Sequence, residues 1–139
     1  MVQIIAGKKG KGKTKHLLDM ANAAIKGANG TVVYLDKSAQ HMYELNNKVR
    51  LIDVSGFPVK NADEFVGFIC GILSQDHDLE QIYLDSFLKV AKLEDKDITG
   101  TLGQLDEIGK QFNVTFVISV SLDKEEIPEA LHGKISVAL

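Results

Sequence analysis

A chain of 139 residues with 45% hydrophobic and 25% charged residues has the composition of one globular domain, which argues against a disordered protein. Its net charge of −3 argues against a general polyanion binder, and the single Cys70 excludes an internal disulfide. No apolar run reaches the roughly 20 residues of a membrane span, and no signal-peptide pattern is present. We therefore expect a cytoplasmic protein with one domain over residues 1–139 and no membrane span.

The amino-terminal third alternates short apolar runs with helical patterns. The runs VQIIA at 2–6 and TVVYL at 31–35 predict strands, and VRLIDV at 49–54 predicts another. Apolar residues recur at helical spacing over 13–26, and Gly27 ends that helix. We also expect a short helix over 39–47.

The rest of the chain continues the alternation. Asn61 and Glu64 form a capping pattern before a helix whose apolar face runs over 65–73, and Cys70 is interpreted as a small packed side chain in it. Strands are predicted over 81–84, 114–120 and 134–139, and a helix over 101–112 with Phe112 directed inward. The charged segment 87–100 has two interpretations, a nucleotide-responsive moving part or a solvated helix and loop.

This order of elements predicts an α/β fold with three layers, α/β/α, around a mostly parallel sheet. Such sheets bind ligands at the carboxyl ends of their strands. The polar residues of interest all follow predicted strands, so the predicted fold and the predicted site support each other.

The stretch GKKGKGKT at 7–14 fits the phosphate-binding P-loop pattern G-x-x-x-x-G-K-[ST]. Glycines at 7, 10 and 12 allow the loop amides to turn inward around an anion. Lys13 would contact the β- and γ-phosphates and Thr14 would hold Mg²⁺, at the positive end of the helix that begins near Lys13. The predicted nucleotide-binding residues are Gly7, Lys8, Lys9, Gly10, Lys11, Gly12, Lys13, Thr14 and Lys15, with Ser119 added below.

The pattern does not require Lys8, Lys9, Lys11 or Lys15. They form either a solvated basic rim around a polyphosphate site or a docking patch for an acidic partner. No aromatic residues are interleaved with them for base stacking, so a nucleic-acid partner is not expected.

A nucleoside triphosphatase also needs an acid at the tip of a neighbouring strand to hold the hydration shell of Mg²⁺. The strand QIYL at 81–84 is followed by Asp85, about seventy residues after the P-loop, and Asp85 is the predicted metal-side acid. The alternative is that Asp85 caps a turn.

With the P-loop, VVYLDKSAQHMYEL at 32–45 and IYLDSFLKVA at 82–91, the chain resembles the core of RecA-like P-loop ATPases over residues 2–121. The resemblance implies a parallel sheet of strand order 5-1-4-3-2 and ATP with Mg²⁺ as ligands. It matches Gly7, Gly12, Lys13 and Thr14 to Walker A and Asp85 to Walker B. It also implies a γ-phosphate-sensing role for Ser119 or Ser121.

The chain departs from the family in the residue that polarises the attacking water. RecA-like enzymes carry a glutamate just beyond the second strand, where this chain has Asp36, two positions early, and Ser86 rather than glutamate follows Asp85. Asp36 is the candidate base, with Glu44 a distant substitute, and the alternative is a solvated strand-end carboxylate. Arg50 is the only arginine and is expected to have a surface role, so a lysine or a partner would have to supply an arginine-finger charge.

These residues indicate a Mg-dependent ATP-binding protein, an ATPase that is slow or stimulated by a partner, with Lys13, Asp36 and Asp85 as catalytic residues. A nucleotide-dependent switch or adaptor that binds ATP without turnover is the alternative, and a small P-loop kinase is a third. A protein partner or a homo-oligomer remains open.

Overall fold

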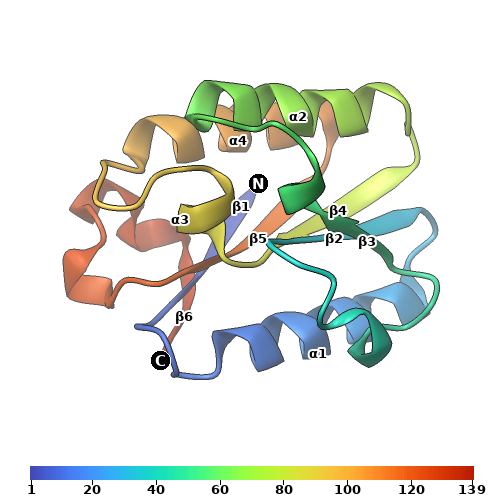
Figure 1. Cartoon of the computed structure of the whole chain (residues 1–139), viewed down its shortest axis with the longest axis horizontal. Helices are drawn as coiled ribbons and strands as arrows, with labels where there is room; N and C mark the ends of the chain where they lie inside the picture. The colour runs from blue at the N-terminus through green and yellow to red at the C-terminus, as the bar shows by residue number, and fades with distance from the viewer.

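The computed structural model describes residues 1–139 as a six-stranded parallel sheet between two layers of helices (Figure 1). The strands are β1 (Val2–Ala6), β2 (Thr31–Asp36), β3 (Arg50–Asp53), β4 (Leu79–Leu84), β5 (Thr115–Val120) and β6 (Ile135–Ala138). The helices are α1 (Lys13–Gly27), α2 (Ala62–Ser74), α3 (Phe87–Val90) and α4 (Thr99–Phe112), with single 3₁₀ segments η1 (Met42–Glu44), η2 (Val54–Gly56), η3 (Lys124–Glu126) and η4 (Glu129–Lys134). The α/β architecture and the three layers agree with the prediction.

The strand order is β3-β2-β4-β5-β1-β6, so the implied order 5-1-4-3-2 is wrong for this sheet. The sheet has one strand more than the implied order, and the added strand is β3. β3 pairs in parallel with β2, with Val33 opposite Arg50 and Asp36 opposite Asp53, and extends the edge of the sheet beyond β2.

Two apolar clusters fill the space on either side of the sheet. The larger one, of 26 buried residues, lies between the sheet and the helices α2, α3 and α4, whereas the smaller one, of 10 residues, lies between the sheet and α1. Phe65, Ile69 and Leu102 belong to the first, and Leu17 and Ala21 to the second. Each helix therefore packs through one apolar stripe, as its spacing predicts.

The start of α2 is capped nearly as predicted. The side chain of Asn61 accepts a hydrogen bond from the amide of Glu64 at 2.9 Å. The Glu64 carboxylate reaches back one residue further than the predicted capping box requires, to the amide of Lys60 at 2.8 Å.

Three local predictions are wrong. The predicted helix over 39–47 is reduced to the single turn η1, because side chains compete for its backbone: Ser38 Oγ accepts from the amide of Gln40 and Asn46 Oδ1 from that of Lys48. Cys70 is exposed, since it lies one residue, about 100° of helix, past the buried Ile69. Phe112 is 53% exposed because α4 ends there.

The segment 87–100 is neither extended nor wholly solvated. It begins with the single helical turn α3, and Phe87, Val90 and Leu93 are buried in the larger apolar cluster, with Ile98 buried just before α4. Its charged side chains between Lys92 and Asp97 are exposed. The segment is thus anchored by apolar residues, and four of its polar residues, Lys89, Glu94, Asp95 and Lys96, line a cavity with Asp36 and Asp85.

Candidate functional site

The loop between β1 and α1, residues 7–12, is here called the glycine–lysine loop. Gly10 and Gly12 both have φ of +89°, a conformation that residues with a side chain rarely adopt. The loop is tied down by a hydrogen bond from the Gly7 amide to the carbonyl of Leu122 at 2.8 Å. No side chain caps the following helix, so its first amides are left for another acceptor.

Lys13, the first residue of α1, is folded back over this loop. Its side chain is 7% exposed, and Nζ donates to the carbonyl of Lys8 at 3.1 Å. Burial lowers the pKa of its ammonium group, and the nearby carboxylates of Asp85 and Asp123 oppose that shift. No carboxylate lies within ion-pair distance of it, so a largely desolvated cation is held here without a direct counter-charge.

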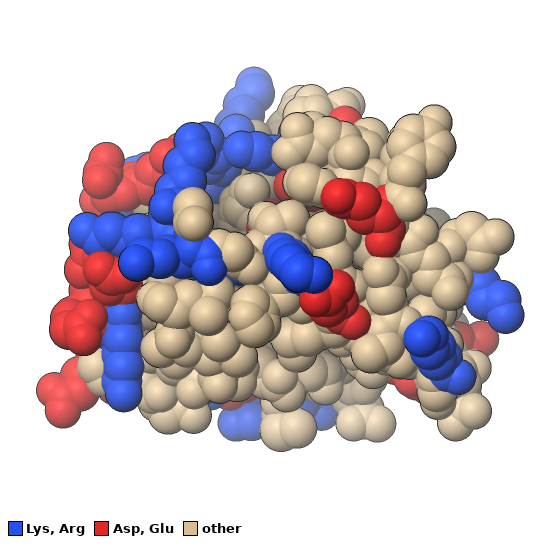
Figure 2. Space-filling model, turned by 90° about the horizontal axis from the view of Figure 1, so that it is seen from below, with Lys and Arg blue, Asp and Glu red and all other residues tan.

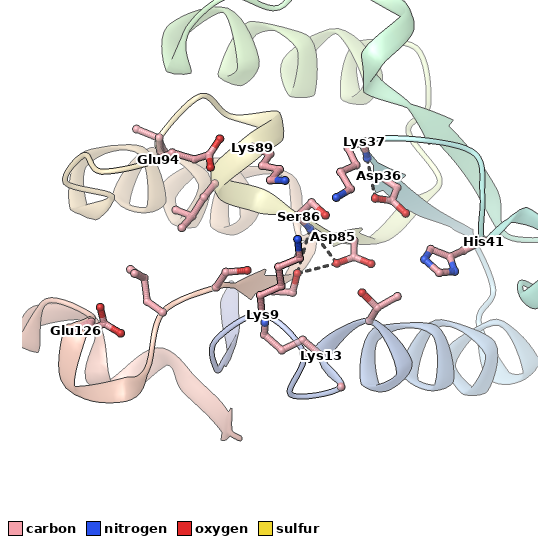
Figure 3. A pocket seen from close by; sticks show the side chains of 18 of the residues that line it. Lys9, Lys13, Asp36, Lys37, His41, Asp85, Ser86, Lys89, Glu94 and Glu126 are labelled. Carbon is pink, nitrogen blue, oxygen red and sulfur yellow. Dashed lines mark hydrogen bonds between the residues drawn. The ribbon is translucent and has the colours of Figure 1, made fainter.

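A cavity of about 790 Å³ opens between this loop and the carboxyl ends of the strands (Figure 3). Eight of the predicted site residues line it: Lys9, Gly10, Gly12, Lys13, Thr14, Asp36, Asp85 and Ser119. Ser121, the alternative to Ser119, lines it as well. The fold thus brings residues from four separate stretches of the chain together.

The alternation of the strands explains why three polar side chains face α1. Tyr34, Tyr83 and Val117 stand opposite one another across β2, β4 and β5, and all three belong to the apolar cluster on the α1 side. Two positions further along each strand direction come Asp36, Asp85 and Ser119. Because every second residue shares a face of the sheet, these side chains lie on the side where the glycine–lysine loop enters α1.

Asp85 is 3% exposed and has partners for both oxygens. Oδ2 accepts from the hydroxyl of Tyr34 at 2.8 Å, and Oδ1 accepts from Ser119 Oγ at 2.9 Å and from the amide of Ser86 at 2.8 Å. Burial, followed by the Asp85 charge, raises the pKa of the Tyr34 hydroxyl, so it remains a donor. This network fixes the carboxylate at the end of β4.

Asp36 differs from Asp85 in lacking a full set of partners. It is 2% exposed; Oδ1 accepts from the amide of Lys37 at 2.7 Å, whereas Oδ2 is buried with no hydrogen-bond partner. Burial, together with the negative charge of Asp85, raises the pKa of Asp36 to about 6. The interpretation of Asp36 as a solvated strand-end carboxylate is therefore wrong.

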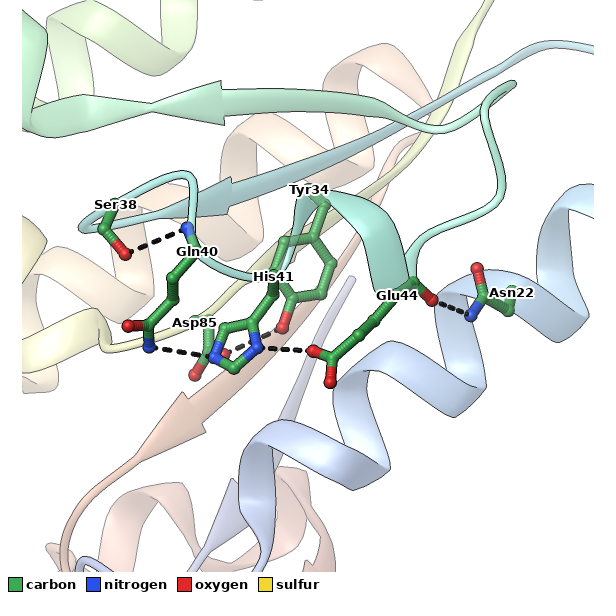
Figure 4. Close-up of polar contacts among 7 residues, drawn as sticks. All are labelled: Asn22, Tyr34, Ser38, Gln40, His41, Glu44 and Asp85. Carbon is green, nitrogen blue, oxygen red and sulfur yellow. Dashed lines mark hydrogen bonds and ion pairs between the residues drawn. The ribbon is translucent and has the colours of Figure 1, made fainter.

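The loop after β2 forms one side of the cavity and is fastened to α1 (Figure 4). His41 Nδ1 and Glu44 Oε2 are 2.5 Å apart, and Gln40 Nε2 is 3.0 Å from the other ring nitrogen. Asn22 of α1 donates to the carbonyl of Glu44 at 2.8 Å and accepts from the amide of Asn46. Glu44 thus contacts His41 and does not line the cavity.

Four predicted nucleotide-binding residues lie outside the cavity lining: Gly7, Lys8, Lys11 and Lys15. Lys8 pairs with Glu126 at 3.4 Å, and Lys15 pairs with Asp19 at 3.2 Å. Basic side chains gather at the left of the face covered by α1, with acidic ones among them (Figure 2). Lys8 and Lys15 thus have acidic partners within the chain.

Several residues at the site were not predicted from the sequence. Lys37 and Lys89 line the cavity, and the Tyr34 hydroxyl donates a hydrogen bond to Asp85. Ser86 has φ of +54°, a left-handed conformation that is uncommon outside glycine and turns the chain sharply after Asp85. The sequence feature that could have indicated them is their position, since all four lie within four residues of Asp36 or Asp85 along the chain.

The cavity offers oxygen atoms suited to Mg²⁺. Thr14 supplies a hydroxyl, and the carboxylate of Asp85 supplies anionic oxygens. Mg²⁺ is commonly bound through one or two carboxylates together with water and phosphate oxygens, so this donor set fits it. No group of three or more His, Cys, Asp or Glu side chains that could hold a metal ion is present.

Comparison with known proteins gives no family for this chain: no protein-family model matches it, and no curated protein is significantly similar. None of its helices has both the length and the apolar character needed to cross a membrane. Its chemistry has to be judged from the site itself.

Proposed function

We propose that the protein binds Mg-ATP as a P-loop protein of RecA-like type and hydrolyses it slowly or when a partner stimulates it. The observation that carries this proposal is the convergence of Lys13 and Thr14 with the buried carboxylates Asp36 and Asp85 around one 790 Å³ cavity. A nucleoside triphosphate presents a compact polyanion, which suits an amide-rich loop with a desolvated lysine.

The topology lends further support. If the edge strand β3 is set aside, the remaining order β6-β1-β5-β4-β2 has the neighbour relations of a 5-1-4-3-2 sheet. In that scheme β5 separates the loop-bearing β1 from β4, whose end carries Asp85. The RecA-like reading then differs from the structure by one added edge strand.

In the proposed reaction a water oxygen attacks the γ-phosphorus, and the bond from that phosphorus to the β–γ bridging oxygen breaks. The bonding pair remains on ADP. Asp36, whose pKa of about 6 suits general-base work near neutral pH, accepts the proton of the attacking water and later releases it to solvent. Bound Mg²⁺ would supply charge neutralisation on the phosphates, held through Thr14 and Asp85.

Lys13 and the loop amides bind and orient the phosphates in this scheme. The ammonium of Lys13 gives up its hydrogen bond to the Lys8 carbonyl and turns to the β- and γ-phosphate oxygens. The network of Tyr34, Ser119 and Ser86 holds Asp85 in place, so little reorganisation is needed when nucleotide binds.

A nucleotide-dependent switch without turnover is the second candidate. It is favoured by the absence of a glutamate after Asp85 and by the position of Arg50, which pairs with Asp76 at 3.7 Å on the edge strand and does not line the cavity. The loss of a general base lowers rates by roughly 10²–10⁴, which is compatible with binding and little hydrolysis.

Calorimetry with Mg-ATP and Mg-GTP, followed by a phosphate-release assay, tests the proposal. We expect ATP binding that Lys13→Ala weakens at least tenfold, while Lys26→Ala, at the exposed far end of α1, leaves it unchanged. Binding of neither nucleotide by the wild-type protein refutes the proposal. Binding with phosphate release no higher than that of Lys13→Ala selects the switch.

A further inference from the structure

The cavity is lined by five lysines and by five acidic residues, which are Asp36, Asp85, Glu94, Asp95 and Glu126. None of the five lysines forms an ion pair within 4.0 Å, although Lys8 and Lys15 nearby do. The five are Lys9, Lys13, Lys37, Lys89 and Lys96. Because these ammonium groups are not engaged in ion pairs within the chain, they are available to an anionic ligand that enters the cavity.

Two of these lysines enter from the side opposite the glycine–lysine loop. Lys37 follows Asp36 directly at the end of β2, and Lys89 lies on α3, four residues after Asp85. Figure 3 shows their side chains directed toward one another above Ser86, with the loop and Lys13 below. Each buried carboxylate of the site is thus followed closely by a cation that faces the same cavity.

The backbone around both lysines is held in place. The Lys37 amide donates to Asp36 Oδ1 at 2.7 Å, and the Lys89 amide donates to the carbonyl of Ser86 at 3.0 Å. Buried Phe87 and Val90 anchor the turn that carries Lys89. The side chains themselves are exposed, so their ammonium groups keep the freedom to reach a ligand.

An ATPase needs positive charge on the γ-phosphoryl oxygens in the transition state, commonly from an arginine finger worth ~10³–10⁵ in rate. This chain has one arginine, Arg50, which pairs with Asp76 away from the cavity. We propose that Lys37 and Lys89 bind the γ-phosphate oxygens from the side opposite Lys13 and supply that charge within a single chain. This inference rests on the proposed function.

The chemistry is the hydrolysis already written, with water attacking the γ-phosphorus and ADP leaving with the bonding pair. Lys37 and Lys89 take no proton in it; they stay protonated and their attraction grows as charge spreads over the equatorial oxygens. Their contribution should therefore appear with a transition-state mimic and not with ADP, which lacks the γ-phosphate.

The test compares ADP affinity with affinity for ADP plus aluminium fluoride in magnesium buffer, measured by calorimetry on the full chain. The variants are Lys37→Ala, Lys89→Ala and Lys89→Arg. Lys92→Ala is the control for Lys89, because it removes a lysine of the same exposed segment that does not line the cavity. Lys48→Ala is the control for Lys37, and thermal unfolding confirms that each variant folds.

We expect the wild-type protein to bind the aluminium fluoride complex at least ~10-fold more tightly than ADP. Lys37→Ala and Lys89→Ala should lose most of that gain while ADP affinity changes less than about threefold, and Lys89→Arg should keep it. The controls should behave like wild type. If ATP is hydrolysed, kcat per chain should not depend on protein concentration.

The two proposals fail in different ways. A wild-type protein that binds no nucleotide refutes the proposed function. A protein that binds ATP but shows no gain with aluminium fluoride, or keeps the full gain in Lys37→Ala and Lys89→Ala, refutes the lysine pair alone. A kcat that rises with protein concentration would assign the missing charge to a second chain and also refute the pair.

Discussion

Replacing Asp36 by asparagine should stabilise the folded protein at neutral pH. Oδ2 of Asp36 is buried without a partner, and burial together with the charge of Asp85 raises the pKa of Asp36 to about 6 from 3.8. The folded state therefore binds this proton more tightly than the unfolded state does. The sign follows: ionisation of Asp36 costs stability progressively as pH rises from about 4 to about 6, and the full cost is present above that window.

The size of this cost follows from the two pKa values. A difference of about two units corresponds to ~3 kcal/mol above about pH 7 and to about half of that near pH 5. Asp36→Asn removes the charge, and Oδ1 of the new amide can still accept from the Lys37 amide. Any constant cost of burying the added NH₂ group cancels between pH values. The advantage of the variant should thus grow by about 1.4 kcal/mol between about pH 5 and about pH 8.

Urea unfolding of the wild type and of Asp36→Asn at these two pH values measures the difference. Asp19→Asn, which removes an exposed carboxylate from α1, controls for the loss of one negative charge. A variant whose advantage stays constant, or shrinks toward higher pH, would show that Asp36 is not held in a strained ionised state. Under the proposed function the same variant should also lose turnover, by roughly 10²–10⁴-fold, with ATP affinity retained.

Two further predictions concern stability alone. Tyr34→Phe leaves Oδ2 of Asp85 buried without its donor and should lower the free energy of unfolding in urea by about 1–3 kcal/mol. Tyr83→Phe is the control and should cost less, because the Tyr83 hydroxyl is only partly buried. Equal costs for the two variants would contradict this prediction. Within α4, a Cβ on Gly109 would lie 2.5 Å from the amino-terminal nitrogen, whereas one on Gly103 would meet nothing within 4 Å. Gly109→Ala should therefore destabilise the folded protein by more than about 1 kcal/mol, whereas Gly103→Ala should stabilise it by about 0.5–1 kcal/mol. If urea unfolding shows that both variants change the stability in the same direction, the packing argument is refuted.

Local sequence patterns predicted the strands and the three long helices closely. Apart from Gln3 and Thr31, the runs over 2–6 and 31–35 are apolar because their strands are covered on both faces, and α1 begins at Lys13 as its pattern indicates. The prediction failed over 39–47, where the amides of Gln40 and Lys48 donate to the side chains of Ser38 and Asn46, and Asn22 of α1 donates to the carbonyl of Glu44. The contacts of Ser38 and Asn46 join residues two positions apart, whereas the contact of Asn22 joins residues that only the folded chain brings together.

The site was foreseen in part. The sequence alone shows the glycines, the lysines and the strand-end acids of the site. The two-residue period of a strand also places Asp36 and Asp85 on one face of their strands. The burial and the hydrogen-bond partners of these two carboxylates could not be predicted from the sequence. Only the fold shows that Asp85 is fully hydrogen-bonded while Asp36 retains an unpartnered oxygen.

By itself the sequence determined which segments become strands and helices and which residue types stand at the strand ends, because those depend on neighbours within a few positions. The tertiary structure decided the strand order, with β3 added at the edge, and brought Lys37 and Lys89 to the cavity that Lys13 enters from the other side. Strand order and side-chain burial depend on contacts between residues that are distant in the chain. No pattern confined to a few neighbouring positions specifies such contacts.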